Sequence, residues 1–313
     1  MKVVAISGGV GGAKLARGLS LIGEDVDLSV VVNTGDDFEH LGLLISPDID
    51  TVTYALAGIA NTEMGWGRAN ETYNVFGELG TYEAPTWFRL GDKDLALHLD
   101  RTGRLRRGER LTEVTAHICE RLGIKAAVLP MTDAPVPTRV QTEDGELDFQ
   151  DYFVRQRCEP VVKGFHFFGI EDANMSREVR RALSEAEAIV FGPSNPFVSV
   201  EPILSLRGMK DAISSKPAVA ISPIVAGAAI KGPAAKMLHE LGLDASALAV
   251  ARKYAGLMRG FVIDNQDAGL APAIESTGLR VLITDTIMTT DEDRRRLAQE
   301  TLEFALSLSP VAP

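Results

Sequence analysis

Two acidic clusters carry the side chains of this sequence that are best suited to hold a metal ion. Residues 33–37 read Asn-Thr-Gly-Asp-Asp and follow the apolar run 28–32, while residues 47–51 read Pro-Asp-Ile-Asp-Thr and open an apolar helical pattern. A single aspartate in such a place is usually a helix cap or a turn residue. Two clusters at the same rim of a sheet favour Mg²⁺, because this ion takes one or two carboxylates together with water and phosphate oxygens.

A glycine cluster near the N-terminus has the pattern of an anion-binding loop. The apolar run 3–6 predicts a buried strand, residues 7–12 read Ser-Gly-Gly-Val-Gly-Gly, and a helical pattern follows at 13–22. In such a unit the backbone amides and the helix dipole converge on a phosphate. The dinucleotide fingerprint is excluded because its third glycine would fall at Lys14, and a Walker loop because Leu15 replaces Ser or Thr. The cluster predicts a phosphate site of unspecified type, with a structural tight turn as the alternative.

A second loop of polar, turn-forming residues follows another apolar run. Residues 192–196 read Gly-Pro-Ser-Asn-Pro after the run 188–191. Polar groups at the carboxyl end of a parallel strand lie where such folds bind ligands, so this loop suits a phosphate or a ribose. A plain turn is an equally good interpretation, because Pro, Ser and Asn are also turn formers. Together these loops offer the following candidate contacts for a nucleotide: Gly8, Gly9, Gly11, Gly12, Lys14, Asn33, Ser194 and Asn195.

Both tryptophans stand beside an arginine and glycines in loop-like sequence. Residues 65–68 read Gly-Trp-Gly-Arg, and residues 87–92 read Trp-Phe-Arg-Leu-Gly-Asp. Large aromatic side chains are usually buried in a core, and the functional alternative is a wall for a flat ring system stacked near arginine. We expect the arginines between positions 101 and 110 to form a solvated face, and the isolated His98 to be structural.

Composition excludes several classes of partner. The chain has 313 residues, of which 45% are hydrophobic and 24% charged, and its net charge is −11. This charge argues against nucleic acid, whose binding needs a basic stripe. Cys119 and Cys158 show neither metal-ligand nor redox spacing, which favours reduced thiols in a cytoplasmic protein. The longest uncharged stretch, 217–230, is too short to cross a membrane and the N-terminus is no signal peptide, so we expect no membrane partner.

The elements that must position these residues alternate between strands and helices. Apolar runs predict further strands at 125–129, 218–221, 260–263 and 281–283. A helical pattern closes the chain at 291–308. Residues 131–170 break the alternation, because a turn at Asp144-Gly145 predicts a hairpin inside a smaller inserted, β-rich region. We therefore expect one α/β domain over 1–313, with three αβα layers around a mostly parallel sheet and this insertion.

The motifs together carry a specific resemblance. In order and spacing they resemble the CofD family over essentially the whole chain: the glycine cluster 8–14, the acidic clusters 33–37 and 47–51, Gly-Trp-Gly at 65–67, residues 87–92, and Pro-Ser-Asn-Pro at 193–196. The resemblance implies a Rossmann-like α/β fold, a requirement for Mg²⁺ and a homodimer. It also implies 2-phospho-L-lactate transferase activity in coenzyme F-420 biosynthesis.

The implied reaction has a nucleotide-linked donor and a deazaflavin acceptor. Such an enzyme moves a phospholactyl-type group from a guanosine diphosphate-linked donor to the 5′-hydroxyl of the deazaflavin Fo, and releases GMP. The three-carbon acid is phospholactate, phosphoenolpyruvate or phosphoglycerate, and no residue of this sequence is assigned to that choice. Because the reaction needs charge neutralisation and in-line positioning more than covalent work, glycine amides, aspartates with a metal, and an arginine suit it.

The resemblance also assigns roles to individual residues. Asp50 and Arg89 match the residues that contact Fo, and Trp87 would form part of the wall around its flat ring. Asp36, with Asp50, falls where the family holds its metal, so Asp36, Asp50 and Arg89 are the expected catalytic set. The glycine cluster and the loop 192–196 would lie along the guanosine diphosphate.

Two points stay open within this assignment. An aspartate of the set serves either as a metal ligand or as the base that deprotonates the acceptor hydroxyl. The neighbouring aspartates, Asp37 and Asp48, are expected to matter less than Asp36 and Asp50.

A family of regulatory proteins offers the competing interpretation. The YvcK-like proteins resemble this fold and bind a nucleotide sugar or a dinucleotide without needing a reaction. Their second loop reads Ala-Asp-Asp-Gly-Gly, whereas residues 35–39 here read Gly-Asp-Asp-Phe-Glu, and they lack a clear match to residues 87–94. Because a shared fold does not fix function, these motif differences make the transferase the favoured interpretation.

Overall fold

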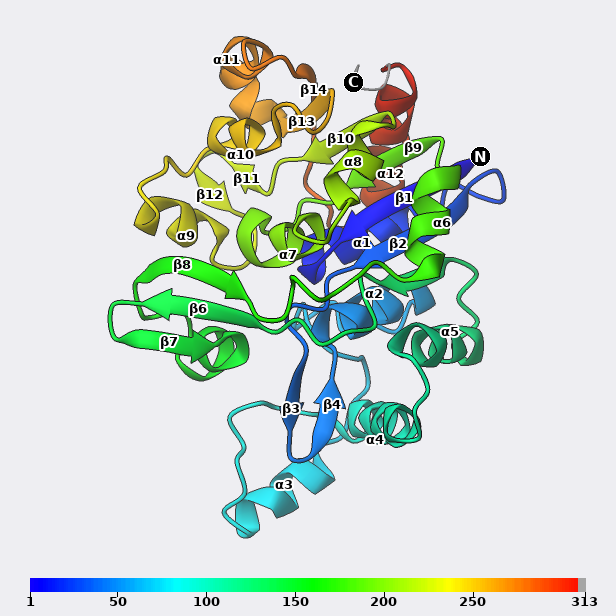
Figure 1. Cartoon of the computed structure of the whole chain (residues 1–313), viewed down its shortest axis with the longest axis vertical. Helices are drawn as coiled ribbons and strands as arrows, with labels where there is room; N and C mark the ends of the chain where they lie inside the picture. The colour runs from blue at the N-terminus through cyan, green and yellow to red at the C-terminus, as the bar shows by residue number, and fades with distance from the viewer. Residues whose placement is uncertain (309–313) are drawn as a thin grey trace.

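The computed structural model describes residues 1–308, and its centre is a parallel β-sheet. Within these residues seven strands pair in the order β14-β13-β10-β9-β1-β2-β5 (Figure 1), and every pairing is parallel. The strands are β1 Lys2–Ser7, β2 Asp27–Val32, β5 Ala127–Pro130, β9 Ala188–Phe191, β10 Ala218–Ile221, β13 Gly260–Asp264 and β14 Arg280–Thr284. Each overlaps the apolar run that predicted it, because continuous apolar runs suit strands that are covered on both faces.

The order of the strands reverses direction beside β1. From β1 the chain moves outward to β2 and β5, and then returns to the other side of β1 to add β9, β10, β13 and β14. Open α/β sheets bind ligands beyond the carboxyl ends of the strands at such a switch point. The loops that leave β1 and β9 at this point are the glycine cluster and residues 192–196.

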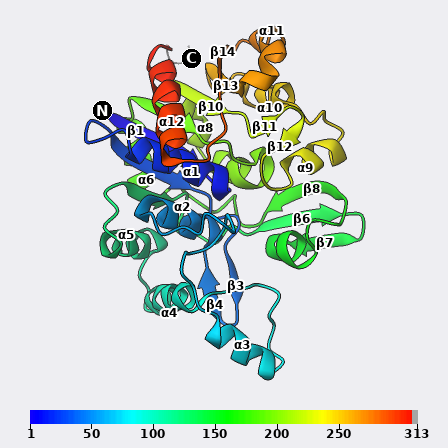
Figure 2. The ribbon, with the colours of Figure 1, turned by 180° about the vertical axis from the view of Figure 1, so that it is seen from behind.

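Helices cover both faces of the sheet and make the predicted three layers (Figure 1, Figure 2). One face carries α1 Gly9–Ser20, α2 Pro47–Ala57, α5 Leu111–Arg121 and α12 Asp291–Leu306. The other face carries α6 Arg177–Glu185, α7 Glu201–Leu204, α8 Met209–Ser214, α9 Ala234–Glu240, α10 Ala247–Tyr254 and α11 Ala271–Glu275. The predicted α/β fold is confirmed.

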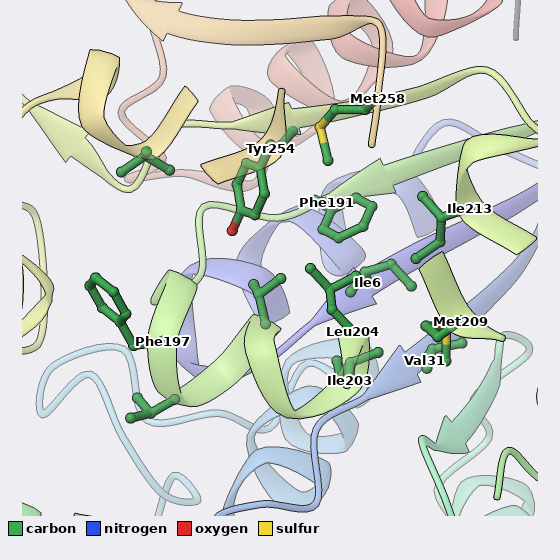
Figure 3. Close-up of a cluster of buried hydrophobic side chains, with 14 of the residues drawn as sticks. Ile6, Val31, Phe191, Phe197, Ile203, Leu204, Met209, Ile213, Tyr254 and Met258 are labelled. Atoms are coloured by element: carbon green, nitrogen blue, oxygen red, sulfur yellow. The ribbon is translucent and has the colours of Figure 1, made fainter. Parts of the chain in front are cut away.

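The two cores follow from the period of a strand. Successive side chains point to opposite faces, so Val3 and Ala5 of β1 enter the core under α1 and α12, while Val4 and Ile6 enter the core on the other face. Figure 3 shows part of this second core, where Phe191 of β9 lies among apolar side chains of α7, α8 and α10. Burial of strand β1 from both sides fixes the loop that leaves its carboxyl end.

Residues between 138 and 167 form a separate antiparallel sheet. Its strands are β6 Thr138–Thr142, β7 Gly145–Asp148 and β8 Val162–Phe167, in the order β7-β6-β8. The predicted hairpin is confirmed: Thr142 pairs with Gly145, whose φ of 127° favours glycine. This sheet lies beside the carboxyl end of the main sheet (Figure 1).

A short hairpin that the sequence did not predict leaves the carboxyl end of β2. Its strands are β3 Phe38–His40 and β4 Leu43–Ile45, and it begins directly after the first acidic cluster. With α3 Asn74–Thr81 and α4 Asp92–Arg106 it makes the lower part of Figure 1. Strands this short show too few alternations for a pattern to be recognised.

The remaining elements are short, and one predicted boundary moves. They are β11 Ile224–Val225, β12 Ala228–Ala229 and the short helical segments Asp151–Arg155, Pro196–Val200 and Asn265–Leu270. Helix α1 begins at Gly9, inside the glycine cluster, rather than near the predicted residue 13. No helix in the described part of the chain combines the length and the apolar character needed to cross a bilayer.

Candidate active site

The glycine cluster and the loop after β9 lie against each other at the switch point. The N–H of Gly8 donates to Oγ of Ser194 at 3.3 Å, and that hydroxyl donates to the carbonyl oxygen of Gly8 at 2.8 Å. The N–H of Gly9 donates to Oδ1 of Asp48 at 2.6 Å. The structure thus brings the two predicted nucleotide loops together and uses two of their amides for bonds within the protein. Their contact with a nucleotide stays a prediction.

Close packing explains several glycines of the cluster. A Cβ atom on Gly8 would lie 2.6 Å from Cβ of Ser199, and one on Gly12 would lie 2.5 Å from Oγ of Ser7. A Cβ atom on Gly11 would collide with the backbone carbonyl of a residue in the β9 loop. Glycine is needed at these positions because two segments of the protein approach closely. The pattern that predicted an approaching ligand therefore also has a structural cause.

Two further nucleotide candidates make contacts outside the glycine loop. Nζ of Lys14 donates to the carbonyl oxygen of Met288 at 2.8 Å. Oδ1 of Asn195 accepts from the N–H of Phe197 at 2.9 Å and caps the helical segment Pro196–Val200. Asn195 therefore has a local structural role, and contact of either side chain with a nucleotide stays a prediction.

Asn33 joins two buried aspartates at the carboxyl end of β2. Its side-chain nitrogen donates to Oδ1 of Asp36 at 2.8 Å and to Oδ2 of Asp48 at 2.9 Å, and its Oδ1 accepts from the N–H of Gly35. Asn33 is fully buried, and Asp36 and Asp48 are 9% and 4% exposed. We call Asn33, Asp36 and Asp48 the Asn33 cluster. It joins the two acidic clusters of the sequence, although through a different aspartate of the second one than predicted.

The electrostatics of the Asn33 cluster suit a bound cation. Burial, and then the carboxylate of Asp48, hold the pKa of Asp36 well above its ordinary value. Burial likewise raises the pKa of Asp48 to about 6. Two adjacent buried carboxylates disfavour their charged forms, and a divalent cation would remove that penalty. Hard carboxylate oxygens are also the ligands that Mg²⁺ prefers, so Asp36 and Asp48 fit the metal that the family resemblance implies.

Two buried hydroxyls beside this cluster lack a partner. Among residues 1–308, Oγ of Ser7 and Oγ1 of Thr34 form no hydrogen bond, although both side chains are buried. Buried polar groups are nearly always paired, so unpaired groups at the ends of β1 and β2 mark a place where a ligand or water completes the bonding. Sequence reasoning missed both residues, because a single Ser or Thr at a strand end is common.

Asp50, which the sequence paired with Asp36, lies outside the Asn33 cluster, and its contact with a metal or with Fo stays a prediction. Asp48 and Asp50 stand two residues apart on the first turn of α2, which turns their side chains about 200° apart around the helix axis. Asp48 therefore faces Asn33, while Asp50 faces α4, where its Oδ2 accepts from Nη1 of Arg101 at 3.0 Å. Arg101 also contacts Oδ1 of Asp50.

The surroundings of Asp50 form a second polar cluster, in which a buried arginine neutralises the carboxylate of Asp50. We call Asp50, Asp94, His98 and Arg101 the Arg101 cluster. One ligand atom each of Asp50, Asp94 and His98 lies within 4.8 Å of the others, a spacing that could accept a metal. Arg101, which is fully buried, already pairs with Asp50 there. Burial opposes its charge, but the carboxylate of Asp50 holds the pKa of Arg101 above its ordinary value. The hydroxyl of Tyr54 donates to Asp94.

The Arg101 cluster corrects one expectation and agrees with another. Arg101 was expected on a solvated face, but it has no exposed surface. Its position on α4 places it opposite Asp50 of α2, a pairing between helices that spacing along the chain does not reveal. His98 is 1% exposed and lies 3.5 Å from Asp94 and 3.8 Å from Asp50, which agrees with a structural role.

A cavity of about 820 Å³ opens beside the Asn33 cluster. Its lining includes Asp36, Phe38, Trp87, Val136, Phe149 and Gln150. The inserted sheet is fixed to this wall: the N–H of Thr138 donates to the carbonyl oxygen of Gly35 at 2.8 Å, and Nε2 of Gln150 donates to that of Asp36 at 3.2 Å. The lining combines these apolar side chains with charged ones such as Glu39, Asp133 and Arg139, and a cavity of this size can hold a small molecule.

Trp87 and Arg89 lie in different surroundings although they are two residues apart. Trp87 is half-buried and lines the cavity, with its ring centroid 6.1 Å from that of Phe38 and 5.1 Å from that of His40. Arg89 is exposed, does not line the cavity, and stacks its Cζ 3.9 Å from the ring centroid of Tyr73. Within residues 1–308 Arg89 forms no ion pair. Its contact with a substrate stays a prediction.

Sequence comparison identifies relatives along nearly the whole chain. The profile of the family described as 2-phospho-L-lactate transferase CofD matches residues 3–301. The chain is 41% identical to the phosphoenolpyruvate transferase of Streptomyces griseus, over 97% of this chain and 98% of that protein. It is 38% identical to the 2-phospho-L-lactate transferase of Methanosarcina mazei, over 95% of this chain and 98% of that protein.

Structural comparison agrees on the fold. A UPF0052-family protein from Bacillus halodurans aligns with a TM-score of 0.62 at 18% identity, over 96% of this chain and 100% of that one. An identity this low supports the α/β fold alone. The sequence relatives do not favour the regulatory, YvcK-like alternative. The chain therefore belongs to the CofD family and is a transferase of coenzyme F-420 biosynthesis.

Proposed function

We propose that this protein transfers a three-carbon phospho-acid from a guanosine diphosphate-linked donor to the 5′-hydroxyl of the deazaflavin Fo. The observation that carries this proposal is the Asn33 cluster, which places two unneutralised, buried carboxylates between the nucleotide loops of the switch point and a cavity walled by Trp87. The names of two relatives, a phosphoenolpyruvate transferase and a 2-phospho-L-lactate transferase, support the class of group transferred.

The proposed step is an in-line displacement at phosphorus. The 5′-oxygen of Fo bonds to the phosphorus that carries the three-carbon acid, the bond from that phosphorus to the oxygen bridging to GMP breaks, and GMP leaves with the electron pair. The acceptor hydroxyl gives its proton to an aspartate of the site that acts as the base, or to solvent. Such reactions need positioning and charge neutralisation from the protein more than covalent chemistry.

We assign the metal to Asp36 and Asp48 rather than to Asp36 and Asp50. Mg²⁺ bound there would neutralise charge on the phosphate oxygens of the donor. Asn33 holds both carboxylates by hydrogen bonds, and the N–H of Gly9 orients Asp48 from the side of the glycine loop. These bonds restrict the carboxylates to one arrangement before any ligand arrives, which lowers the cost of assembling the site.

The two substrates would approach the Asn33 cluster from opposite sides. The donor would lie along the glycine cluster and Ser194, at the switch point between β1 and β9. The acceptor would enter the cavity, with Trp87 and Phe38 beside its flat ring. Arg89, at the exposed end of the same segment, would contact the acceptor from outside the cavity. For Asp50 we propose a positioning role, because its carboxylate is 8% exposed and bound to Arg101.

The remaining expectations from the family resemblance are a homodimer and a cytoplasmic location. We propose both for this protein on that ground. Light scattering on the purified protein at two concentrations would test the dimer. A monomer at both concentrations would exclude it without affecting the proposed reaction.

The test of the function is a reaction with defined substrates. Purified protein, Fo and Mg²⁺ are incubated with each guanylylated acid in turn, derived from phospholactate, phosphoenolpyruvate and phosphoglycerate. We expect GMP together with a phosphodiester-linked deazaflavin, detected by mass spectrometry, and the preferred donor identifies the three-carbon acid. Equal release of GMP with and without Fo would make the protein a hydrolase and would reject the transfer.

A further inference from the structure

Four aromatic side chains from two distant segments pack together at the wall of the cavity. They are Phe38 and His40 of β3, and Trp87 and Phe88 of the loop between α3 and α4. The ring centroids of every pair among them lie between 4.8 and 6.1 Å apart. We call these residues the four-ring cluster. Phe38 and Trp87 line the cavity, whereas His40 and Phe88 do not.

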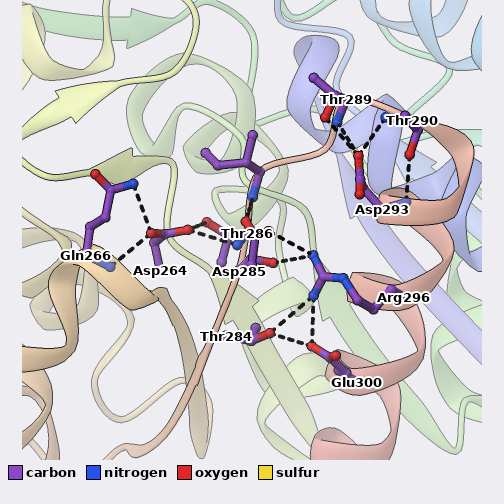
Figure 4. Close-up of polar contacts among 11 residues, drawn as sticks. Asp264, Gln266, Thr284, Asp285, Thr286, Thr289, Thr290, Asp293, Arg296 and Glu300 are labelled. Carbon is purple, nitrogen blue, oxygen red and sulfur yellow. Dashed lines mark hydrogen bonds and ion pairs between the residues drawn. The ribbon is translucent and has the colours of Figure 1, made fainter.

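The loop that carries Trp87 has no backbone anchor of its own. Within residues 1–308, the backbone of residues 86–90 forms no hydrogen bond with the backbone of another segment. Figure 4 shows how a different irregular segment, between β14 and α12, is fixed: Asp264 accepts from the N–H and from the hydroxyl of Thr286, at 2.9 and 3.0 Å. Contacts between rings therefore take over, for Trp87, the role that such bonds play elsewhere.

His40 is the closest ring that reaches Trp87 from the other segment. The two centroids are 5.1 Å apart and the ring planes meet at 73°, which is a favourable edge-to-face arrangement. Phe38 is farther away, at 6.1 Å with an angle of 40°. Phe88 follows Trp87 directly in the chain and moves with it, so it cannot fix Trp87 to the rest of the protein.

The support beneath His40 is itself held in place. His40 ends strand β3, and helix α4 bonds the hairpin β3–β4 at two points. Oγ1 of Thr102 accepts from the N–H of Leu44 at 2.8 Å, and Nη2 of Arg106 donates to the carbonyl oxygen of Gly42 at 2.7 Å. The side chain of His40 is 6% exposed. A buried ring on a fixed hairpin can hold its neighbour in one orientation.

His40 acts on Trp87 as an uncharged ring. Burial lowers the pKa of His40, against a smaller opposite influence of the backbone of Pro85, so the neutral form is favoured. Among the described residues its Nε2 forms no hydrogen bond. The contact that matters is therefore the ring itself, and phenylalanine could supply it.

We propose that His40 is a positioning residue for the acceptor, because its ring holds Trp87 in the cavity wall in the orientation that the flat ring of the acceptor meets. The inference rests on the proposed function and adds a residue that no motif indicated. If Trp87 were free to turn, it would have to be ordered when the acceptor binds, and that cost would weaken binding. The donor, which would lie at the switch point, should not be affected.

The test uses Trp87 as its own reporter. The chain has two tryptophans, so Trp66→Phe leaves Trp87 as the only one, and Trp66 is 43% exposed. His40→Ala, His40→Phe and a matched control, His166→Ala, are compared in this background by fluorescence. His166 also packs edge-on against a phenylalanine, Phe168 at 6.3 Å, but it lies on β8 and neither residue lines the cavity. Affinity for Fo, by calorimetry, and steady-state kinetics are measured for the same three substitutions in the wild-type chain.

We expect His40→Ala to change the emission of Trp87 without any substrate present. The emission should shift to longer wavelength and be quenched more strongly by acrylamide, because the indole loses its nearest neighbour. The Kd and the KM for Fo should rise about tenfold, while kcat and the KM for the donor change little. His40→Phe should restore both the emission and the affinity, and His166→Ala should match the wild type.

Two results would overturn the inference. One is an emission and an affinity for Fo in His40→Ala that equal those of the wild type. The other is a lower melting temperature with equal losses of affinity for Fo and for the donor, which would make His40 a support of the whole fold.

Failure of the proposed function gives a different result. If the wild type binds Fo but releases no GMP, tenfold weaker binding of Fo by His40→Ala and its recovery in His40→Phe support the positioning role while the reaction is rejected. If the wild type turns over and His40→Ala binds Fo equally well, the reaction stands while the positioning role is rejected.

Discussion

Asp48 and Asp50 stand two residues apart on one turn of α2, and their charges are treated in opposite ways. Asp50 meets the guanidinium of Arg101, which is fully buried, so the charge is balanced inside the protein. Asp48 meets only donors that carry no charge, the amide of Asn33 and the N–H of Gly9, and its nearest charged neighbour in the Asn33 cluster is another carboxylate. In the Arg101 cluster the carboxylate of Asp50 has a counter-ion within the protein, whereas neither carboxylate of the Asn33 cluster is paired with a cationic side chain.

This difference separates structural acids from functional ones. A buried charge without a counter-ion is costly, and a protein keeps it only where a ligand supplies the missing charge. Burial and like charge in the Asn33 cluster therefore point to a metal, while equal burial in the Arg101 cluster points to a fixed contact between α2 and α4. Proximity of acidic groups does not distinguish the two cases. Asp50, Asp94 and His98 have a spacing that could accept a metal, and yet Asp50 is already paired with Arg101.

The largest effect is expected from a substitution that breaks the Arg101 cluster. Arg101→Met would leave the buried carboxylate of Asp50 unpaired, and losing one partner of a buried ion pair costs about 3–5 kcal/mol of the free energy of unfolding. Thermal melts of the variant and the wild type measure the loss. The double variant Arg101→Met with Asp50→Asn removes both charges and should recover part of it. If Arg101→Met melts like the wild type, the ion pair contributes nothing and the contrast between the clusters fails.

The next effect concerns catalysis at the Asn33 cluster. Asp36→Asn and Asp48→Asn each remove a carboxylate from the proposed metal site, and we expect turnover to fall by about 10²–10³-fold, as when one charge-stabilising group is removed. Stability in the absence of metal should not fall, because each change relieves the repulsion between two buried carboxylates. GMP release as a function of Mg²⁺ concentration, measured beside thermal melts, tests both statements.

Matched variants on both sides of α2 sharpen this result. Asp37→Asn, whose parent side chain accepts from Ser46, should keep most of the activity. Asp50→Asn should lose stability, because it leaves Arg101 buried without its partner. If Asp48→Asn responds to Mg²⁺ like the wild type and Asp50→Asn does not, the metal lies with Asp50 and the assignment is reversed.

Much of the framework could be predicted from the sequence, because the apolar runs are continuous. A strand covered on both faces needs apolar residues at every position, so β9 Ala188–Phe191 and β10 Ala218–Ile221 match the predicted residues. The polar loops that follow the apolar runs also predicted that the candidate site lies at the carboxyl edge of the sheet. The hairpin β3–β4 could not be found, because its strands are too short to show alternation.

The sequence could not show whether Asp48 or Asp50 lies beside Asp36, because that depends on how α2 is rotated about its axis. A spacing of two residues on a helix already implies that the side chains diverge, so the sequence could have shown that only one of the two aspartates lies beside Asp36. Which of them faces the site depends on how α2 is turned, and that is set by burial of Ile49 and Val52 in the core under the sheet. Arg101 is distant in sequence from Asp50, and no local pattern marks this pair.

A smaller effect appears in the pH dependence of stability without metal. The pKa of Asp48 rises from its ordinary value of 3.8 to about 6 on folding, so the native state binds the proton more tightly than the unfolded state. The free energy of unfolding should therefore fall as pH rises between about 4 and about 6, by at most about 1.4 kcal/mol for each unit of the shift. Asp48→Asn should flatten this part of the profile, and so should saturating Mg²⁺. A wild-type profile that rises over the same interval would contradict the raised pKa.

The smallest effect compares two arginines, the buried Arg101 and the exposed Arg89. Arg89 forms no ion pair within the described residues and lies over the ring of Tyr73, so its removal should leave the melting temperature unchanged. Its planar fork of donors is free for the acceptor, and we expect Arg89→Ala to raise the KM for Fo about tenfold with little change in the KM for the donor. Arg89→Lys should restore only part of the affinity, because an ammonium lacks the fork.

Tyr73→Phe keeps the ring and should behave like the wild type, while Tyr73→Leu should reproduce a part of the Arg89→Ala effect. Steady-state kinetics with Fo and donor varied separately decide the matter: equal KM values for Fo in Arg89→Ala and the wild type would leave Arg89 as a surface residue.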